Sequence, residues 1–542
     1  MVYPGQPSRG CETCRARKVK CDETRPTCLR CAKAKRVCGG YRMLSDTRKP
    51  QKSSVLLMRL SMPSSTSPGN TSSLTPIQDY LKSPLVRDEL VSLSSCSSAA
   101  LGRVKVHNIL SRLIDCPQVI SIYDGCLTCL PVLFPNLKRS TPILPALAAY
   151  LLAFVSHREY GNQVQTQAVQ SYVRALALMR QVAGQTHPSR KNEIIGTILL
   201  LSMYEEFSSL GSDQSVLNSH IRGAMAFVQS QPLDDFEDPI NRKLCTALLN
   251  RCMYSCIHHR QPSLSRDRFP FTIHRLRALH DSLIQERAVN PRSSLHPVTC
   301  RLVSLYLRST MVEEESVGLF HETATKINSI INAINAVEVQ LSRWPHSLPP
   351  EWKYETTKLL SEDNDTLDAW TTTALTYPAF WVANDWAHYR ALSIFTHSLQ
   401  LRCYRLLRTM YSLVPGLDSL STLAELSANI ESIHIKISHF VDEICASVPY
   451  HLGYHRTGTN ETLYPREGFP PGKYPRLISA CHVLWPLYVA GVAEGRKISA
   501  QTMWIAQQLD NMGKEMGIRQ ASVLATEVVK VAMERTEYVE PL

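Results

Sequence analysis

Six cysteines near the N-terminus have the residue type and spacing of a metal centre. They follow the pattern C-x2-C-x6-C-x6-C-x2-C-x6-C, in which the last three repeat the intervals of the first three: Cys11, Cys14, Cys21, Cys28, Cys31 and Cys38. Thiolates select zinc, and three of them leave a tetrahedral zinc one ligand short. Six sulfurs complete two sites only if two of them bridge, so the spacing predicts a binuclear cluster with two zinc ions.

Two short helices must position these thiols. In each half, two cysteines one turn apart stand at the start of a helix, and the third returns after the helix has ended. A segment this short buries too little apolar surface to fold alone. Zinc must therefore supply its folding free energy, roughly 10 kcal/mol or more per structural ion, and we expect the segment to be unfolded without it.

Positive charge is concentrated in the same segment. Residues 1–50 contain thirteen Lys and Arg against four Asp and Glu, and so carry +9 of the chain's net +12. Six thiolates and two zinc ions add about −2. The remaining charge suits the phosphate backbone of double-stranded DNA, with an affinity that falls steeply with salt. A solvated basic surface is the alternative, but charges fixed on a rigid metal scaffold favour DNA.

With these features the segment resembles the fungal zinc binuclear cluster (Zn2Cys6) DNA-binding domain of fungal transcription factors. The resemblance covers the six cysteines, the basic run at 15–20 and Pro26 in the loop between the halves. It implies two bridging cysteines and two further ligands for each zinc: Cys11 and Cys28 as bridges, Cys14 and Cys21 for one ion, Cys31 and Cys38 for the other.

The resemblance also assigns roles in DNA binding. In the family, the first helix directs its C-terminal end into the major groove and reads a CGG triplet. This implies base contacts by Arg17 and Lys18, whose donors suit O6 and N7 of guanine. Arg15, Lys20 and Arg25 are expected to contact phosphates, which set position without reading sequence. The basic segments are also typical of nuclear import signals, so we expect a nuclear protein.

The rest of the 542-residue chain is expected to form a larger helical domain. Residues 51–100 contain fourteen serines and scattered prolines, which predicts a flexible linker over 46–104 between the cluster domain, 1–45, and an all-α domain, 105–542. Apolar residues in that domain recur at i, i+3, i+4 and i+7. Helices are expected within 166–184, 192–209, 215–230, 388–410, 422–448 and 501–516, the first three as antiparallel neighbours.

The helical region looks like the fungal-specific transcription factor regulatory domain. The similarity is carried by residues in three expected helices and two later stretches: Tyr172, Ala175, Leu176, Tyr204, Glu205, His220, Gly223, Ala224, 444–454 and Trp485. It implies regulation by a ligand, a partner or self-association. Family members often dimerise through a coiled coil behind the cluster. The linker contains no sustained heptad, so a homodimer here would lack an obvious coiled coil.

Other stretches have compositions that bear on membrane, metal or catalytic roles. The apolar runs at 143–155 and 481–493 are shorter than the ~20 residues of a membrane span and predict core helices, not membrane contact. Cys126 and Cys129 have no further ligand at metal spacing, which favours buried thiols. A denser group would point in several directions from one helix: Cys252, Cys256, His258 and His259. G-x-G-x-x-G and G-x-S-x-G are absent, so we expect no catalytic residues and no enzyme.

An acidic stretch at 361–370 has two interpretations. Acidic residues mixed with Leu367 and Trp370 are typical of flexible activation segments. The same residues fit a helix start with Asp365 or Thr366 as N-cap and Trp370 in the core, which we favour.

Taken together, the sequence predicts a nuclear, zinc-dependent, sequence-specific regulator of RNA polymerase II transcription. Its partners would be double-stranded DNA and the transcription machinery, and it would read CGG-type triplets. Family analogy adds control of a metabolic pathway or of a biosynthetic gene cluster for a secondary metabolite. The alternatives are a co-regulator recruited through the helical domain and an enzyme with an appended zinc cluster.

Overall fold

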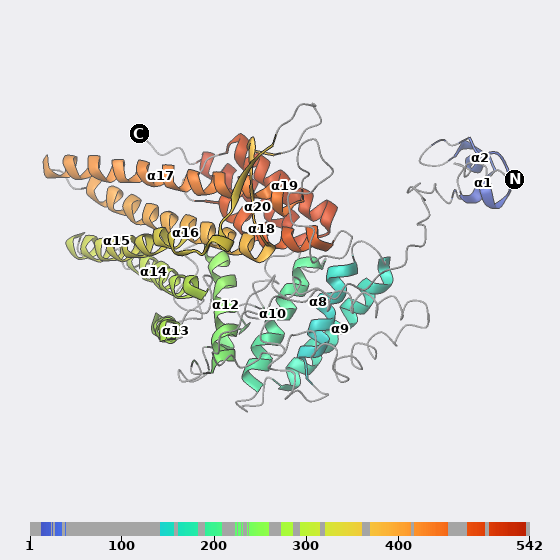
Figure 1. Ribbon diagram of the computed structural model, residues 1–542, viewed down its shortest axis with the longest axis horizontal. Helices are drawn as coiled ribbons and strands as arrows, with labels where there is room; N and C mark the ends of the chain where they lie inside the picture. Colours follow the sequence, from blue (N-terminus) through green and yellow to red (C-terminus); the bar gives the residue numbers. More distant parts are fainter. Residues whose placement is uncertain are drawn as a thin grey trace. The chain divides into compact units, whose positions relative to one another are not determined.

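The chain divides into two compact units, Met1–Ser72 and Ser73–Leu542. Its structure is a computed structural model (Figure 1). The residues that it describes are 12–22, 24, 28–34, 38, 141–156, 161–182, 190–208, 220, 223–224, 226–228, 230, 236, 238–258, 273–285, 293–314, 320–359, 369–413, 417–453, 474–493 and 498–537. The expected linker, the pair Cys126 and Cys129, and most of the acidic stretch lie outside them.

The N-terminal unit contains two short helices that contact each other. Helix α1 spans Glu12–Ala16 and helix α2 spans Leu29–Lys33, five residues each. Each begins directly after the first cysteine of its half, as the duplicated spacing predicts.

The second unit begins with a group built around helix α8, Ile143–Ser156, whose described side chains are all buried. Helices α9, Gly161–Val182, and α10, Lys191–Phe207, both pack on it. The two were expected to be direct neighbours, and they do touch, but each packs more extensively on α8. A helix that is apolar on every side must be covered on every side. The run at 143–155 is therefore a core helix, and among the described residues no helix combines the length and apolarity needed to cross a membrane.

Further helices follow in chain order, mostly packed against their neighbours in sequence (Figure 1). Their bounds are α12 Pro239–His258, α13 Ile273–Gln285, α14 His296–Glu314, α15 Phe320–Arg343, α16 Phe380–Ser412, α17 Leu417–His451, α18 Tyr474–Gly491, α19 Ala500–Met516 and α20 Arg519–Glu537, with 3-10 turns η5 Ser293–Leu295, η6 Pro345–Ser347 and η7 Pro350–Trp352. Helix α20 also returns to pack on α10. The expected all-α class is confirmed, and the run at 481–493 lies largely in buried α18.

One small sheet was not predicted. Strands β1, Glu355–Lys358, and β2, Thr373–Thr376, pair antiparallel, and β2 packs on α17. Trp370 lies in a bend just before β2, not in a helix. Its side chain is 37% exposed and lies near Trp504, with ring centroids 6.1 Å apart. The expectation of a helix start with Trp370 in the core was therefore wrong at this residue, because the chain there enters a strand.

A fully buried arginine ties the sheet region to α16 and α17. Arg390 is 0% exposed; its Nε donates to Glu443 Oε2 at 2.9 Å and its Nη1 to the Tyr377 hydroxyl at 2.6 Å. The guanidinium also lies over the rings of Tyr354 and Trp386, at 5.1 and 5.2 Å. Burial is tolerated because the charge meets a carboxylate and aromatic faces.

Residues from the regulatory-domain resemblance come together in a second polar cluster. The Tyr172 hydroxyl donates to Glu205 Oε1 at 2.7 Å and lies 3.0 Å from His220 Nε2. His220 Nε2 is also 2.8 Å from Glu205 Oε1, and Tyr172 stacks on Tyr204. Burial, followed by the adjacent Glu205 carboxylate, raises the pKa of Tyr172 well above its ordinary value. The cluster joins three sequence segments of one core, which accounts for these residues structurally.

Candidate metal centre and DNA interface

The sulfur atoms of three predicted ligands converge in the N-terminal unit. Cys14, Cys28 and Cys31 are each 0% exposed, and their Sγ atoms lie within 4.8 Å of one another. The separations from Cys14 Sγ are 3.7 Å to Cys28 and 3.9 Å to Cys31. A Zn–S bond of about 2.3 Å gives a tetrahedral edge of about 3.8 Å, so this donor set fits zinc.

Cys21 and Cys38 are half-buried and pack against this group, while Cys11 lies outside the described residues. The Cys38 Sγ accepts from the Cys28 backbone N–H at 3.5 Å. The sequence-predicted thiols that the structure describes are thus gathered at one place. Zinc bound there would cross-link the two halves and supply the folding free energy that so small a core lacks.

Helix α2 begins on a predicted ligand. Cys28 is its N-cap, and the Cys28 sulfur accepts from the backbone N–H of Cys31 at 3.2 Å. Backbone N–H groups at a helix N-terminus favour negative charge, so they stabilise the thiolate form that binds metal.

Helix α1 is followed directly by the two residues that the resemblance assigns to base contacts. The backbone N–H of Val19 donates to Cys14 O at 3.0 Å, which closes the helix in the manner of a Schellman motif. Lys18 adopts the left-handed conformation that this motif requires, with φ 52°, where glycine is the usual residue. Arg17 and Lys18 are both exposed, and so is Lys20. Cys14, a predicted ligand, therefore also fixes the end of the helix that presents the basic side chains.

Two predicted phosphate contacts, Arg15 and Arg25, have side chains outside the described residues. The backbone of Arg15 belongs to α1. Cys252, Cys256 and His258 lie on one helix, α12, as expected. Their side chains lie outside the described residues.

One positioning residue was missed in the sequence. The Asp22 carboxylate accepts from the backbone N–H groups of Leu29 and Arg30, at 3.0 and 2.8 Å, and from Thr24. The Thr24 hydroxyl bond and these backbone donors outweigh desolvation and hold the pKa of Asp22 well below its usual range. The carboxylate therefore joins the end of the first half to the start of α2. The Asp-x-Thr sequence after Cys21 is an Asx-turn signal that could have indicated it.

Comparison with known proteins bears on this unit. Residues 9–48 match the fungal Zn(2)-Cys(6) binuclear cluster domain. The chain carries a binuclear zinc cluster domain. Its relatives include the transcriptional regulatory protein moc3 of Schizosaccharomyces pombe, 62% identical over 32 residues, or 6% of each chain. White-opaque regulator 2 of Candida albicans is 56% identical over 36 residues, covering 7% of this chain and 8% of the relative.

A third relative is the aspercryptin biosynthesis cluster-specific transcription regulator atnN of Emericella nidulans, 49% identical over 47 residues, or 9% of this chain and 8% of the relative. The matches thus span less than a tenth of these relatives. No solved structure matches the chain. The matched domain is a zinc-binding one, and the relatives that share it are named as regulators, two of them as regulators of transcription.

Proposed function

We propose that this chain is a nuclear, sequence-specific regulator of RNA polymerase II transcription that reads CGG-type triplets. The observation that carries the proposal is the end of α1, where the Cys14 carbonyl accepts from the backbone N–H of Val19 and so fixes the turn that presents exposed Arg17 and Lys18. Guanidinium and ammonium donors at a fixed helix end suit the O6 and N7 acceptors of guanine. All six cysteines serve as ligands in this proposal, with Cys11 and Cys28 shared between the two zinc ions.

The test is fluorescence anisotropy of the zinc-loaded full chain on short duplexes at two salt concentrations. The duplexes carry one CGG, two CGG in each relative orientation, or a scrambled triplet. We expect a CGG preference that is lost with a chelator, and tighter binding to one paired arrangement if two chains bind as a homodimer. Equal, salt-sensitive binding to all duplexes would contradict sequence reading and favour a co-regulator recruited through the helical unit.

Two substitutions separate base contacts from general charge. Arg17→Ala should lower the preference for CGG over the scrambled duplex, by about 1–3 kcal/mol if the contact is bidentate. Lys33→Ala removes one exposed positive charge from the last residue of α2 and serves as the matched control. It should weaken binding to every duplex by the same factor. The same uniform loss in Arg17→Ala would make Arg17 a phosphate contact.

Control of a metabolic pathway is the finer part of the proposal. Its support is that relatives are named for aspercryptin biosynthesis and for arginine metabolism. Chromatin immunoprecipitation should then find this protein at promoters of genes that serve one pathway; a scatter of unrelated promoters would count against it.

A further inference from the structure

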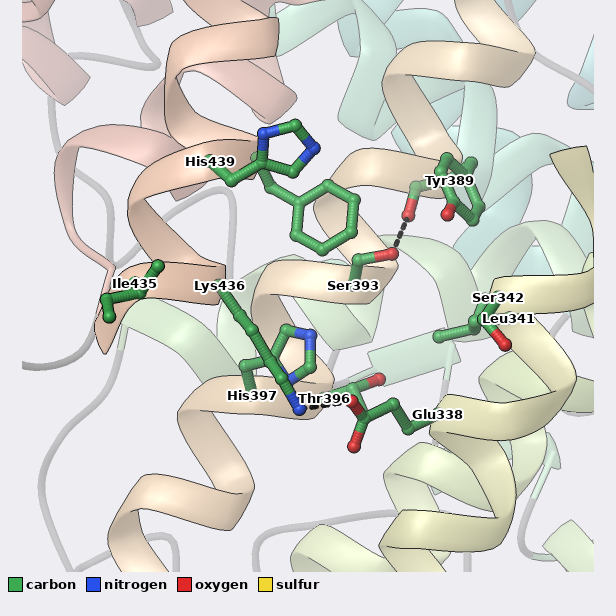
Figure 2. A pocket seen from close by; sticks show the side chains of 11 residues that line it. Glu338, Leu341, Ser342, Tyr389, Ser393, Thr396, His397, Ile435, Lys436 and His439 are labelled. Carbon is green, nitrogen blue, oxygen red and sulfur yellow. Dashed lines mark hydrogen bonds and ion pairs between the residues drawn. The ribbon is translucent and has the colours of Figure 1, made fainter. Parts of the chain in front are cut away.

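Three long helices of the second unit enclose a cavity of about 420 Å³. Its lining comes from one face of each helix: positions 338, 341 and 342 of α15, positions 389, 393, 396 and 397 of α16, and positions 435, 436, 439 and 440 of α17. These spacings place each set on a single helical face. Figure 2 shows Lys436 and Glu338 reaching toward each other from opposite sides of the cavity. The volume lies within the range of small-molecule sites.

Much of the lining is aromatic or has its hydroxyl groups already hydrogen-bonded within the protein. The hydroxyls of Ser393 and Thr396 donate to backbone carbonyls one turn earlier in α16, at 3.0 and 2.8 Å. Phe440 lies edge-on to Tyr389, with ring centroids 6.0 Å apart, and stacks on His397 at 5.8 Å. A flat aromatic ring would therefore bury apolar surface against Phe440 and Tyr389 without unpairing the hydroxyls of Ser393 and Thr396.

At one end of the cavity, a chain of hydrogen bonds determines which atoms can donate to or accept from a ligand. Burial raises the pKa of Glu338, but hydrogen bonds from Lys436 and Gln400 outweigh it, so the pKa lies below its ordinary value and the carboxylate only accepts. Gln400 Nε2 donates to Glu338 at 2.7 Å and to Asn335 at 2.9 Å, which turns Gln400 Oε1 toward His397 Nδ1 at 2.8 Å. His397 Nδ1 must then carry the proton.

The other nitrogen of His397 is thereby an acceptor. Burial lowers the pKa of His397, which keeps the ring neutral, and no described residue donates to Nε2. The Lys436 ammonium pairs with Glu338 at 2.7 Å and has further donor capacity. The charges of Lys436 and Glu338 neutralise each other, so Lys436 presents a donor and His397 Nε2 an acceptor to the cavity without adding net charge. At the rim, Ile435 is 65% exposed, an apolar surface that an occupant would cover.

We propose that this cavity binds an uncharged, planar aromatic molecule that carries a hydroxyl and a carbonyl group. The hydroxyl donates to His397 Nε2, the carbonyl accepts from Lys436, and the ring lies against Phe440 and Tyr389. This is a site in the helical unit that DNA binding does not use, and its test is independent of DNA.

The probe is 6-acetyl-2-naphthol, titrated with the zinc-loaded full chain and followed by its fluorescence. We expect saturable binding, and binding about tenfold weaker for 2-acetylnaphthalene, which lacks the hydroxyl, and for 2-naphthol, which lacks the carbonyl. Lys436→Met should abolish the advantage of the carbonyl and leave that of the hydroxyl. Absence of saturable binding, or equal binding of the three probes, would overturn the proposal.

A matched pair of variants locates the binding. Ser342→Trp fills the mouth of the cavity from an exposed position whose hydroxyl donates only to its own helix, at Val339 O. Ser427→Trp makes the same change at an exposed serine of α17 outside the cavity, where the hydroxyl donates to Leu423 O. We expect at least about tenfold weaker binding in the first and none of that loss in the second. Unchanged binding in Ser342→Trp would place the probe elsewhere and refute the site.

Discussion

Lys18 is the residue at which folding of the zinc domain and reading of DNA can be separated. Its φ of 52° lies in the left-handed region, which costs an L-residue about 1–2 kcal/mol. Glycine avoids that cost, but its greater chain entropy costs about 0.5–1 kcal/mol. Lys18→Gly should therefore stabilise the folded domain by about 0.5–1 kcal/mol, whereas Lys18→Ala keeps the strain. Because folding is coupled to metal binding, zinc affinity should rise about two- to fivefold in the glycine variant alone.

The assay is chelator competition for zinc on the full chain, followed by DNA anisotropy on the same three proteins. Both variants lose the same side chain, so both should lose CGG preference by a similar amount, about 1 kcal/mol or more. If Lys18→Gly binds zinc no more tightly than Lys18→Ala, the reasoning from backbone strain is refuted. If both variants keep the CGG preference, Lys18 does not contact a base.

Three further outcomes are expected. Asp22→Asn should release zinc to a chelator more readily than wild type, because the backbone N–H groups at the start of α2 lose a charged acceptor. Asp22→Ala should release zinc more readily still, because it leaves them no side-chain acceptor. Equal release in all three proteins would count against the role of Asp22 in positioning α2. Arg390→Met should lower the free energy of unfolding, measured in urea, by about 3 kcal/mol. This is the lower end of the range for a broken buried ion pair, because the partner Glu443 is 21% exposed. Arg402→Met breaks the partly exposed pair with Glu313 and should lower it by about 1 kcal/mol or less. Similar losses of unfolding free energy in the two variants would refute the argument that burial makes the Arg390 pair the costlier one to break. Burial lowers the pKa of His451 from 6.5 to about 3, so the unfolded chain binds an extra proton between these values. Stability should fall by up to about 1.4 kcal/mol per pH unit as the pH drops below 6.5, and His451→Asn should flatten that slope in urea titrations at several pH values; an unchanged slope would exclude this histidine.

The sequence predicted most of the candidate metal centre because its ligands are local. Cysteine spacing indicated the duplicated halves, the two short helices and the zinc, and the resemblance implied that Arg17 and Lys18 end the first helix. Asp22 was missed although its Asx-turn signal is visible, because its bond to α2 depends on how the two halves fold together. The small sheet was missed because strands of four residues are too short for a clear alternation.

In the second unit, helical periodicity predicted where helices lie but not which of them meet. Helices 166–184 and 192–209 were placed correctly, yet both pack mainly on α8. The resemblance singled out Tyr172, Glu205 and His220 without indicating that they bond to one another.

By itself, the sequence determined the zinc-binding cysteine cluster, the local positive charge and the helical class, since each depends on residue types at short, fixed intervals. Tertiary structure alone decided the pairing of Arg390 with Glu443 and the cavity with His397 at one end. The physical reason is that periodicity shows which face of a helix is apolar but not which face covers it. A buried charge, a fixed tautomer and a hollow exist only where faces from distant segments meet.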